Sequence, residues 1–195
     1  MFVILAIPLL YSVIAHEVAH GWVAYLFGDN TAKHSGRLTF NPAVHLDPMG
    51  TLALFFVGFG WAKPVPVNYA NLKNFRLGLI CVALAGCVTN ILIATIALSL
   101  LRIGTISANP LAVTVLFVVA RVNIILGAFN LIPIPPLDGS KVLMGFLPFE
   151  TQRVLASIEP YGFFVLIFLL FTGLLSPVIG FVQNIIIFFI GLVLR

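Results

Sequence analysis

Charged residues are scarce in this chain of 195 residues: 8% are Asp, Glu, Lys or Arg, whereas 61% are hydrophobic. A soluble domain carries about 25% charged residues. Ten Lys plus Arg and six Asp plus Glu are too few to cover an apolar core with polar surface. The shortage of charge excludes an ordinary water-soluble fold and favours an integral membrane protein. The basic residues are also too scattered to form a nucleic-acid-binding surface, so no nucleic-acid partner is expected.

Cysteine is nearly absent as well, because the chain contains only Cys81 and Cys87. These two residues lie in one apolar run, six residues apart, so they point in different directions on a helix. No disulfide is expected between them. The chain also lacks an evident internal repeat, and its apolar runs are joined by short loops. We therefore expect residues 1–195 to form a single integral-membrane domain.

Long apolar runs are abundant and define the expected architecture. Three of them reach the roughly 20 residues that a helix needs to cross a bilayer. They lie at about 2–27, 77–101 and 110–132. A fourth run, 161–194, is broken by Ser176-Pro177 and predicts two short spans or a hairpin of helices.

A shorter apolar run at residues 49–60 contains three glycines and is too short to cross the membrane. It predicts a re-entrant or interfacial segment. The fold class expected is an all-α polytopic membrane protein with about five to six transmembrane helices and a re-entrant or short β or extended segment near its active site.

The basic residues predict the orientation of the spans. Most Lys and Arg side chains lie between the first and second long runs and after the third, and only Arg102 marks the opposite side. Loops rich in Lys and Arg stay in the cytoplasm. We therefore expect the N-terminus outside, residues 28–76 and 133–160 in the cytoplasm, and Arg195 inside.

The most informative motif, His16-Glu17-Val18-Ala19-His20, lies within the first long run. Residues four apart on a helix differ by about 40° around its axis, so both imidazoles can reach one metal ion. Glu17 then stands beside the metal, where it can take a proton from water and return it to a leaving amine. A lone membrane histidine more often hydrogen-bonds a neighbouring helix. Two histidines with an intervening glutamate favour a zinc peptidase centre.

A catalytic zinc ion usually takes three protein ligands and a water molecule, so a third ligand must come from elsewhere. Spacing alone leaves several candidates: Asp29, His34, His45, Asp47, Asp138, Glu150 and Glu159. Asp138 is favoured because it ends a stretch with three prolines that follows the third long run. Such non-helical backbone is tolerated near the membrane only in packed protein or beside a water-filled cavity. An ordinary Asp-Gly turn is the alternative.

Four segments resemble the motifs of the site-2 proteases, a family of intramembrane zinc metalloproteases. They are HEVAHG at 16–21, NPAVHLDPMG at 41–50, GWAKPVPVN at 60–68 and NLIPIPPLDGSK at 130–141. The chain is similar to the compact branch of this family, which has no PDZ or CBS domain. The resemblance implies one zinc ion held by His16, His20 and Asp138, with Glu17 as the general base.

The same resemblance implies a function and a location. It implies hydrolysis of peptide bonds within or near transmembrane segments of membrane-protein substrates, which is regulated intramembrane proteolysis. The expected partners are such a substrate and the lipid bilayer, and an oligomer stays open. A prokaryotic cytoplasmic membrane is implied, and the predicted orientation opens the active site to the cytoplasm.

The second long run departs from the family pattern. A Gly-Pro-x-x-Asn element is replaced by Gly86-Cys-Val-Thr-Asn90, which keeps the asparagine and loses the proline. Asn90 is expected either to bond the substrate backbone or oxyanion, or to bridge two helices. His45 matches another family position. Two roles stay open for it: contact with the substrate or the oxyanion, or a structural hydrogen bond.

Proline at alternate positions in Lys63-Pro-Val-Pro-Val67 predicts an edge strand or an extended loop. A helical substrate must unwind before its peptide bond can be attacked, and pairing with this edge would replace the hydrogen bonds that it loses. Arg121, Asn123 and Asn130 also interrupt the third long run, where structural pairing is expected rather than catalysis.

Two other functions would use the same residues. A metal transporter or channel would place His16, Glu17, His20 and Asp138 along a transit path. Such a protein should show further polar residues leading across the membrane, or repeated halves, and neither is visible in the sequence. An inactive adaptor is disfavoured because the ligands and the base are all present.

Overall fold

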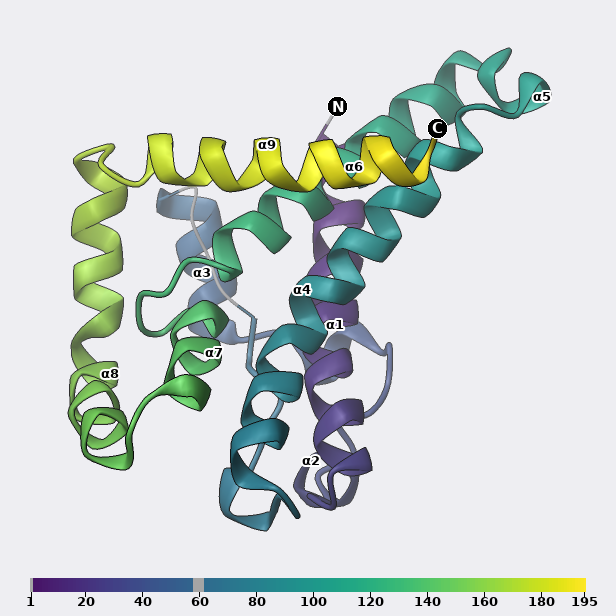
Figure 1. Cartoon of the computed structure of the whole chain (residues 1–195). Coiled ribbons are helices and arrows are strands. Elements are labelled where there is room, and N and C mark those ends of the chain that lie inside the picture. Colours follow the sequence, from purple (N-terminus) through teal and green to yellow (C-terminus); the bar gives the residue numbers. More distant parts are fainter. Residues whose placement is uncertain (1, 58–61) are drawn as a thin grey trace.

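The computed structural model describes residues 2–57 and 62–195, and most of these residues are helical (Figure 1). The helices are α1 (Phe2–Leu26), α2 (Thr31–His34), α3 (Pro48–Val57), α4 (Phe75–Leu100), α5 (Gly104–Ser107), α6 (Pro110–Asn130), α7 (Asp138–Phe146), α8 (Phe149–Phe171) and α9 (Ser176–Val193), with 3-10 turns η1 (Pro42–Val44) and η2 (Tyr69–Asn71). Within the described ranges there is no strand, only an isolated antiparallel bridge between Leu46 and Ala62. The all-α fold class is confirmed.

Among the residues that the structure describes, five helices are long and apolar enough to cross a membrane: α1, α4, α6, α8 and α9. The three long spans expected from the sequence correspond to α1, α4 and α6, with ends that differ by at most two residues. The starts of α4 and α6 follow from their caps. Asn74 accepts a hydrogen bond from the N–H of Leu77, and Asn109 accepts from the N–H groups of Leu111 and Ala112.

The fourth span begins earlier than expected. Hydropathy placed it from residue 161, but α8 begins at Phe149 and includes residues 149–160, which the sequence analysis assigned to a loop. This first half mixes polar and apolar residues, so it does not register as an apolar run. Glu150 in its first turn interacts favourably with the helix dipole, and Pro160 lies inside the helix without ending it.

The predicted break at Ser176-Pro177 is confirmed, because α9 begins at Ser176. The hairpin alternative is wrong: α9 does not fold back along α8 but runs crosswise to it, across the upper part of the view and past α6 (Figure 1). Apolar packing explains this course, since α9 contributes Ile186 and Ile190 to a cluster with α4 and α6. In Figure 1 the C-terminus lies on the side of the view opposite α2, and the expectation that Arg195 returns to the side of the basic loops stays a prediction.

The apolar run 49–60 is described up to residue 57. Residues 49–57 lie in α3, which has ten residues, too few to cross a bilayer. Gly58 and Gly60 fall outside the described residues. The prediction that this segment does not cross the membrane agrees with the length of α3.

The centre of the molecule is formed by α1, α4 and α6, which pack pairwise against one another, with α7 packed on α4 (Figure 1). Both cysteines are free, as expected, and Cys87 is buried. Several polar side chains are also buried in this centre: Ser12, His16, His20, Asn90 and Asn123. Buried polar groups in a membrane protein require partners, and theirs are found at the metal centre.

Candidate metal centre

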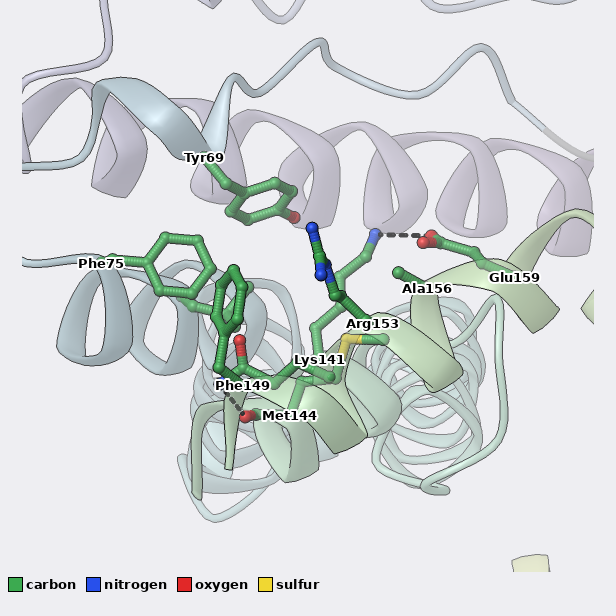
Figure 2. A pocket seen from close by; sticks show the side chains of 10 residues that line it. Tyr69, Phe75, Lys141, Met144, Phe149, Arg153, Ala156 and Glu159 are labelled. Carbon is green, nitrogen blue, oxygen red and sulfur yellow. Dashed lines mark hydrogen bonds and ion pairs between the residues drawn. The ribbon is translucent and has the colours of Figure 1, made fainter. Parts of the chain in front are cut away.

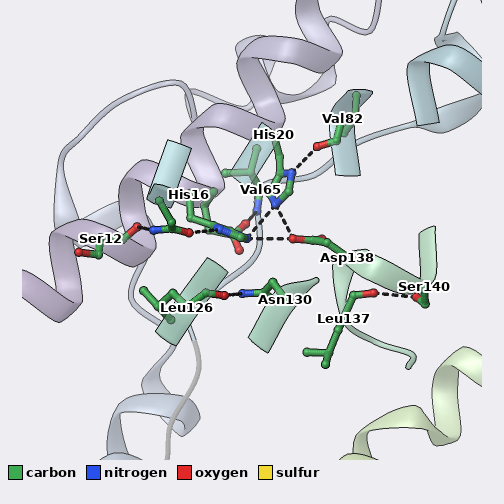
Figure 3. A network of polar contacts seen from close by, with 12 residues as sticks. Ser12, His16, His20, Val65, Val82, Leu126, Asn130, Leu137, Asp138 and Ser140 are labelled. Carbon is green, nitrogen blue, oxygen red and sulfur yellow. Dashed lines mark hydrogen bonds and ion pairs between the residues drawn. The ribbon is translucent and has the colours of Figure 1, made fainter. Parts of the chain in front are cut away.

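Three of the predicted ligands converge on one point, as Figure 3 shows. His16 and His20 lie one turn apart on α1, and Asp138 opens α7. Asp138 Oδ2 is 3.0 Å from His16 Nε2 and 3.1 Å from His20 Nε2. The two Nε2 atoms are 3.0 Å apart. The three side chains therefore present ligand atoms within 4.8 Å of one another.

Hydrogen bonds on the far side of each imidazole determine which nitrogen faces this point. His16 Nδ1 donates to Asn90 Oδ1 at 2.6 Å, and His20 Nδ1 donates to the carbonyl oxygen of Val82 at 2.6 Å. Each ring thus carries its proton on Nδ1 and turns the lone pair of Nε2 inward. Two lone pairs and a carboxylate oxygen meet with no proton donor between them. A cation stabilises such an arrangement, and this donor set fits zinc.

The loop before α7 delivers Asp138 to the centre. It contains the cis peptide bond Pro135-Pro136. Gly139, the residue after Asp138, lies so close to the carbonyl group of Leu131 that a Cβ on Gly139 would overlap it. A carboxylate binds a metal ion in its ionised form, and Asp138 Oδ2 lies at the same point as the two Nε2 atoms.

Glu17 faces a cavity of about 290 Å³ that also contains the three ligands. Its Oε2 atom accepts a hydrogen bond of 2.8 Å from the backbone N–H of Val65. The walls of this cavity, here called the metal cavity, are formed by residues from α1, the extended segment 63–68, η2, α6 and α7. A carboxylate and the ligand atoms thus share one space that can admit water and a peptide unit.

The segment carrying Val65 forms neither helix nor strand and ends at Asn68 in extended backbone, which fits the loop predicted from its alternating prolines. It is anchored at Lys63, whose N–H donates to the carbonyl oxygen of His45 at 2.8 Å. The carbonyl oxygen of Lys63 accepts from Arg37 Nη2 at 2.6 Å. His45 has no exposed surface, and its ring Nε2 donates to the carbonyl oxygen of Thr39 at 2.8 Å. The structure thus places His45 behind segment 63–68 and outside the lining of the metal cavity.

Asp29 anchors the other end of segment 63–68. Its carboxylate accepts from the N–H of Asn68 at 2.8 Å and from Asn71 Nδ2 at 2.9 Å. It also accepts from the N–H and the hydroxyl of Thr31, at 3.1 and 2.5 Å. Burial raises the pKa of Asp29, but these four bonds lower it more, so the pKa lies below its ordinary value. Spacing alone made Asp29 a candidate third ligand. Its carboxylate instead bonds Thr31, Asn68 and Asn71.

Asn90 is completely buried and faces His16 from α4. Its Nδ2 donates to Asn123 Oδ1 on α6 at 2.7 Å and to the carbonyl oxygen of Ser12 on α1 at 3.4 Å. Gly86, one turn earlier, lies so close to His16 that a Cβ would overlap the imidazole. The Gly86-Cys-Val-Thr-Asn90 element therefore makes room for the ring and bonds its Nδ1.

The sequence analysis did not assign two residues of this network to the site. Asn123 Nδ2 donates to Ser12 Oγ at 2.7 Å and to the carbonyl oxygen of Val119 at 2.8 Å. Ser12 precedes His16 by one helical turn, and that i, i+4 spacing was the signal available in the sequence. The structural pairing expected for Arg121 is not found among the described residues, 2–57 and 62–195. The Arg121 side chain is exposed. Asn130 lines the metal cavity.

Five apolar helices of spanning length around a His-His-Asp group and a glutamate define a membrane-embedded metalloprotease. The profile of peptidase family M50 matches residues 98–173. YwhC of Bacillus subtilis (strain 168), named as a zinc metalloprotease, is 41% identical over 182 residues, which cover 90% of this chain and 83% of YwhC. No solved structure matches the chain significantly.

A second relative, Rip2 of Mycolicibacterium smegmatis, is also named as a zinc metalloprotease. It is 30% identical over 184 residues, which cover 90% of this chain and 70% of Rip2. The chain belongs to peptidase family M50, the site-2 proteases. It is a zinc metalloprotease of the membrane.

Proposed function

We propose that this enzyme cleaves peptide bonds within or next to transmembrane segments of other membrane proteins. In this proposal His16, His20 and Asp138 hold one zinc ion and Glu17 is the general base. The observation that carries it is the convergence of three unprotonated ligand atoms beside Glu17, in a cavity between helices of membrane-spanning length.

Zinc held by these residues supplies Lewis-acid activation of a water molecule and of the scissile carbonyl group. Glu17 takes the proton from the attacking water and returns it to the leaving amine. The Val65 N–H holds Oε2 of Glu17 in place. Asn90 accepts a hydrogen bond from His16 Nδ1 and so orients the imidazole, which makes Asn90 a positioning residue.

The substrate would enter as a partly unwound helix. Its exposed peptide groups need new hydrogen-bond partners, and the extended segment 63–68 lies along one wall of the metal cavity, where Pro64, Val65 and Val67 line it. Pairing along this segment would place the scissile bond over the ligands. His16 and His20 lie in the half of α1 that leads to the basic loop, so we propose that water and products exchange on the cytoplasmic side.

The decisive experiment compares purified wild type with Glu17→Gln on a panel of single-span substrates in detergent, with zinc content measured for both. We expect about one zinc ion in each protein and a loss of cleavage of about 10²- to 10⁴-fold in the variant. Glu150→Gln is the matched control, because Glu150 is exposed and outside the metal cavity. Equal cleavage by wild type and Glu17→Gln would remove Glu17 from the reaction. Zinc movement across liposomes without cleavage would replace the protease with a transporter.

A further inference from the structure

A second cavity, of about 250 Å³ (Figure 2), shares lining residues with the metal cavity. It is formed by η2 and helices α4, α7 and α8. Phe75, Met144 and Phe149 supply much of its apolar wall. We call it the side cavity.

The two cavities share two residues, Tyr69 and Lys141, each of which lines both. The Lys141 ammonium nitrogen is 5.7 Å from the centroid of the Tyr69 ring. Burial raises the pKa of the Tyr69 phenol, which therefore stays protonated and can donate a hydrogen bond. A peptide that occupies the metal cavity can continue past this pair into the side cavity.

The charges at the side cavity leave one cation unpaired. Lys141 Nζ lies 3.6 Å from Glu159 Oε1. Burial lowers the pKa of Lys141, but Tyr69, Glu159 and Asp138 together outweigh burial and raise it, so this amine is charged. The guanidinium of Arg153 lies 5.6 Å from the centroid of the Phe149 ring, and no acidic partner for it occurs within the described ranges. In Figure 2 Arg153 points toward Tyr69.

We propose that the side cavity is a substrate subsite that receives a bulky apolar side chain flanking the scissile bond, next to an acidic residue that pairs with Arg153. This inference rests on the proposed proteolytic function. The apolar wall accounts for the first preference, and the unpaired guanidinium for the second. Continuity through Tyr69 and Lys141 favours the substrate chain over a lipid head group, since it links the subsite directly to the ligands.

The test uses a single-span substrate that wild type cleaves. Asp, Asn or Lys is placed in turn at each of the positions flanking the cleaved bond, and kcat/KM is measured for wild type and Arg153→Glu. Arg76→Glu is the matched control, because Arg76 is an exposed cation in the first turn of α4 that lines neither cavity. Zinc content verifies that each variant keeps an intact centre.

At one flanking position we expect wild type to prefer Asp over Lys by about threefold to tenfold, as for a partly exposed ion pair. Arg153→Glu should reverse this preference, and Arg76→Glu should leave it unchanged. Phe149→Ala should reduce the preference for a large apolar residue at the neighbouring position by a similar factor. Rescue of a Lys-bearing substrate by Arg153→Glu would show direct pairing, which a change in fold cannot produce.

Two results would overturn the subsite. In the first, Arg153→Glu keeps the wild-type preference at every position. In the second, it slows all substrates equally and the loss follows the anionic lipid content of vesicles, which would assign the cavity to a lipid head group. Failure of the proposed function is distinct: wild type would retain zinc and cleave none of the substrates.

Discussion

His16 is positioned by side chains from three helices. Gly86 on α4 leaves room for its ring, Asn90 accepts its Nδ1 proton, and Asn123 on α6 bonds Asn90. Because Asn123 Nδ2 is bonded to Ser12 Oγ and to the Val119 carbonyl oxygen, its Oδ1 is directed to Asn90. Asn90 must then donate with Nδ2 and accept with Oδ1. The orientation of one amide thus fixes the tautomer of a proposed metal ligand.

Replacing Asn123 by Leu should therefore weaken zinc binding, although Asn123 does not contact the proposed ligands. We expect a loss of affinity of about 10- to 100-fold, the range for residues that orient metal ligands. The measurement is zinc retention against a competing chelator in detergent. Thr95→Val on α4 is the matched control, because among the described residues the Thr95 hydroxyl bonds only the Ile91 carbonyl oxygen of its own helix. Unchanged affinity in Asn123→Leu would reduce Asn123 to a packing residue.

Segment 63–68 is anchored at both ends and also bonds the proposed general base, Glu17. Lys63 and Asn68 hold its ends, and Val65 between them bonds Glu17. Its extended form could be predicted from Pro64 and Pro66, because proline fixes φ and removes a donor. Its contacts could not, because Asp29 and Glu17 reach it from parts of the chain that only the fold brings together. A sequence pattern predicts the local conformation of an element better than it predicts which distant residues that element contacts.

Replacing Asp29 by Asn should destabilise this element in a pH-dependent manner. The native pKa of Asp29 lies below its ordinary value, so its contribution is complete above about pH 4 and is lost as the pH falls below that value. We expect a loss of about 1–3 kcal/mol at pH 7 and a smaller difference from wild type at pH 3. Thermal unfolding in detergent at both pH values measures this, with Thr95→Val, which removes no charge, as control. A difference independent of pH would contradict the assigned role.

Apolar runs also predicted α1, α4 and α6 well, since lipid imposes length and composition on a spanning helix. They failed for α8, whose first half carries Gln152, Arg153 and Glu159. These three polar residues line the side cavity. Hydropathy detects contact with lipid, and so it misses helix that extends beside a protein cavity.

At the scale of the whole molecule, the proposed ligands join α1 to α7, across 122 residues of sequence. The three proposed ligands were predicted from motif spacing for the two histidines, and from the preceding proline-rich stretch together with the family resemblance for Asp138. The crosswise course of α9 was not predictable, because its helical length and composition fit a further span equally well. It depends on packing against Ala94, Ile124 and Ala128 from distant helices.

Removal of zinc should therefore lower the stability of the whole fold. A ligand present at a thousandfold excess over its Kd stabilises the native state by about 4 kcal/mol. We expect a chelator to lower the Tm of wild type and Glu17→Gln equally, because Glu17 is not a proposed ligand. Without chelator, the Tm of His20→Ala should already be lower than that of wild type, and the chelator should change it little. An identical chelator response in His20→Ala would show that the metal is bound elsewhere.

The donor that holds Glu17 belongs to the backbone of Val65 and not to a side chain. Every amino-acid replacement at position 65 except proline keeps that N–H, and Pro64 and Pro66 on either side restrict the path of the chain around it. Substitution at this position can thus change what the cavity wall accepts while leaving the carboxylate anchored. Substrate preference is in this way free to diverge among descendants of the enzyme without loss of the chemistry.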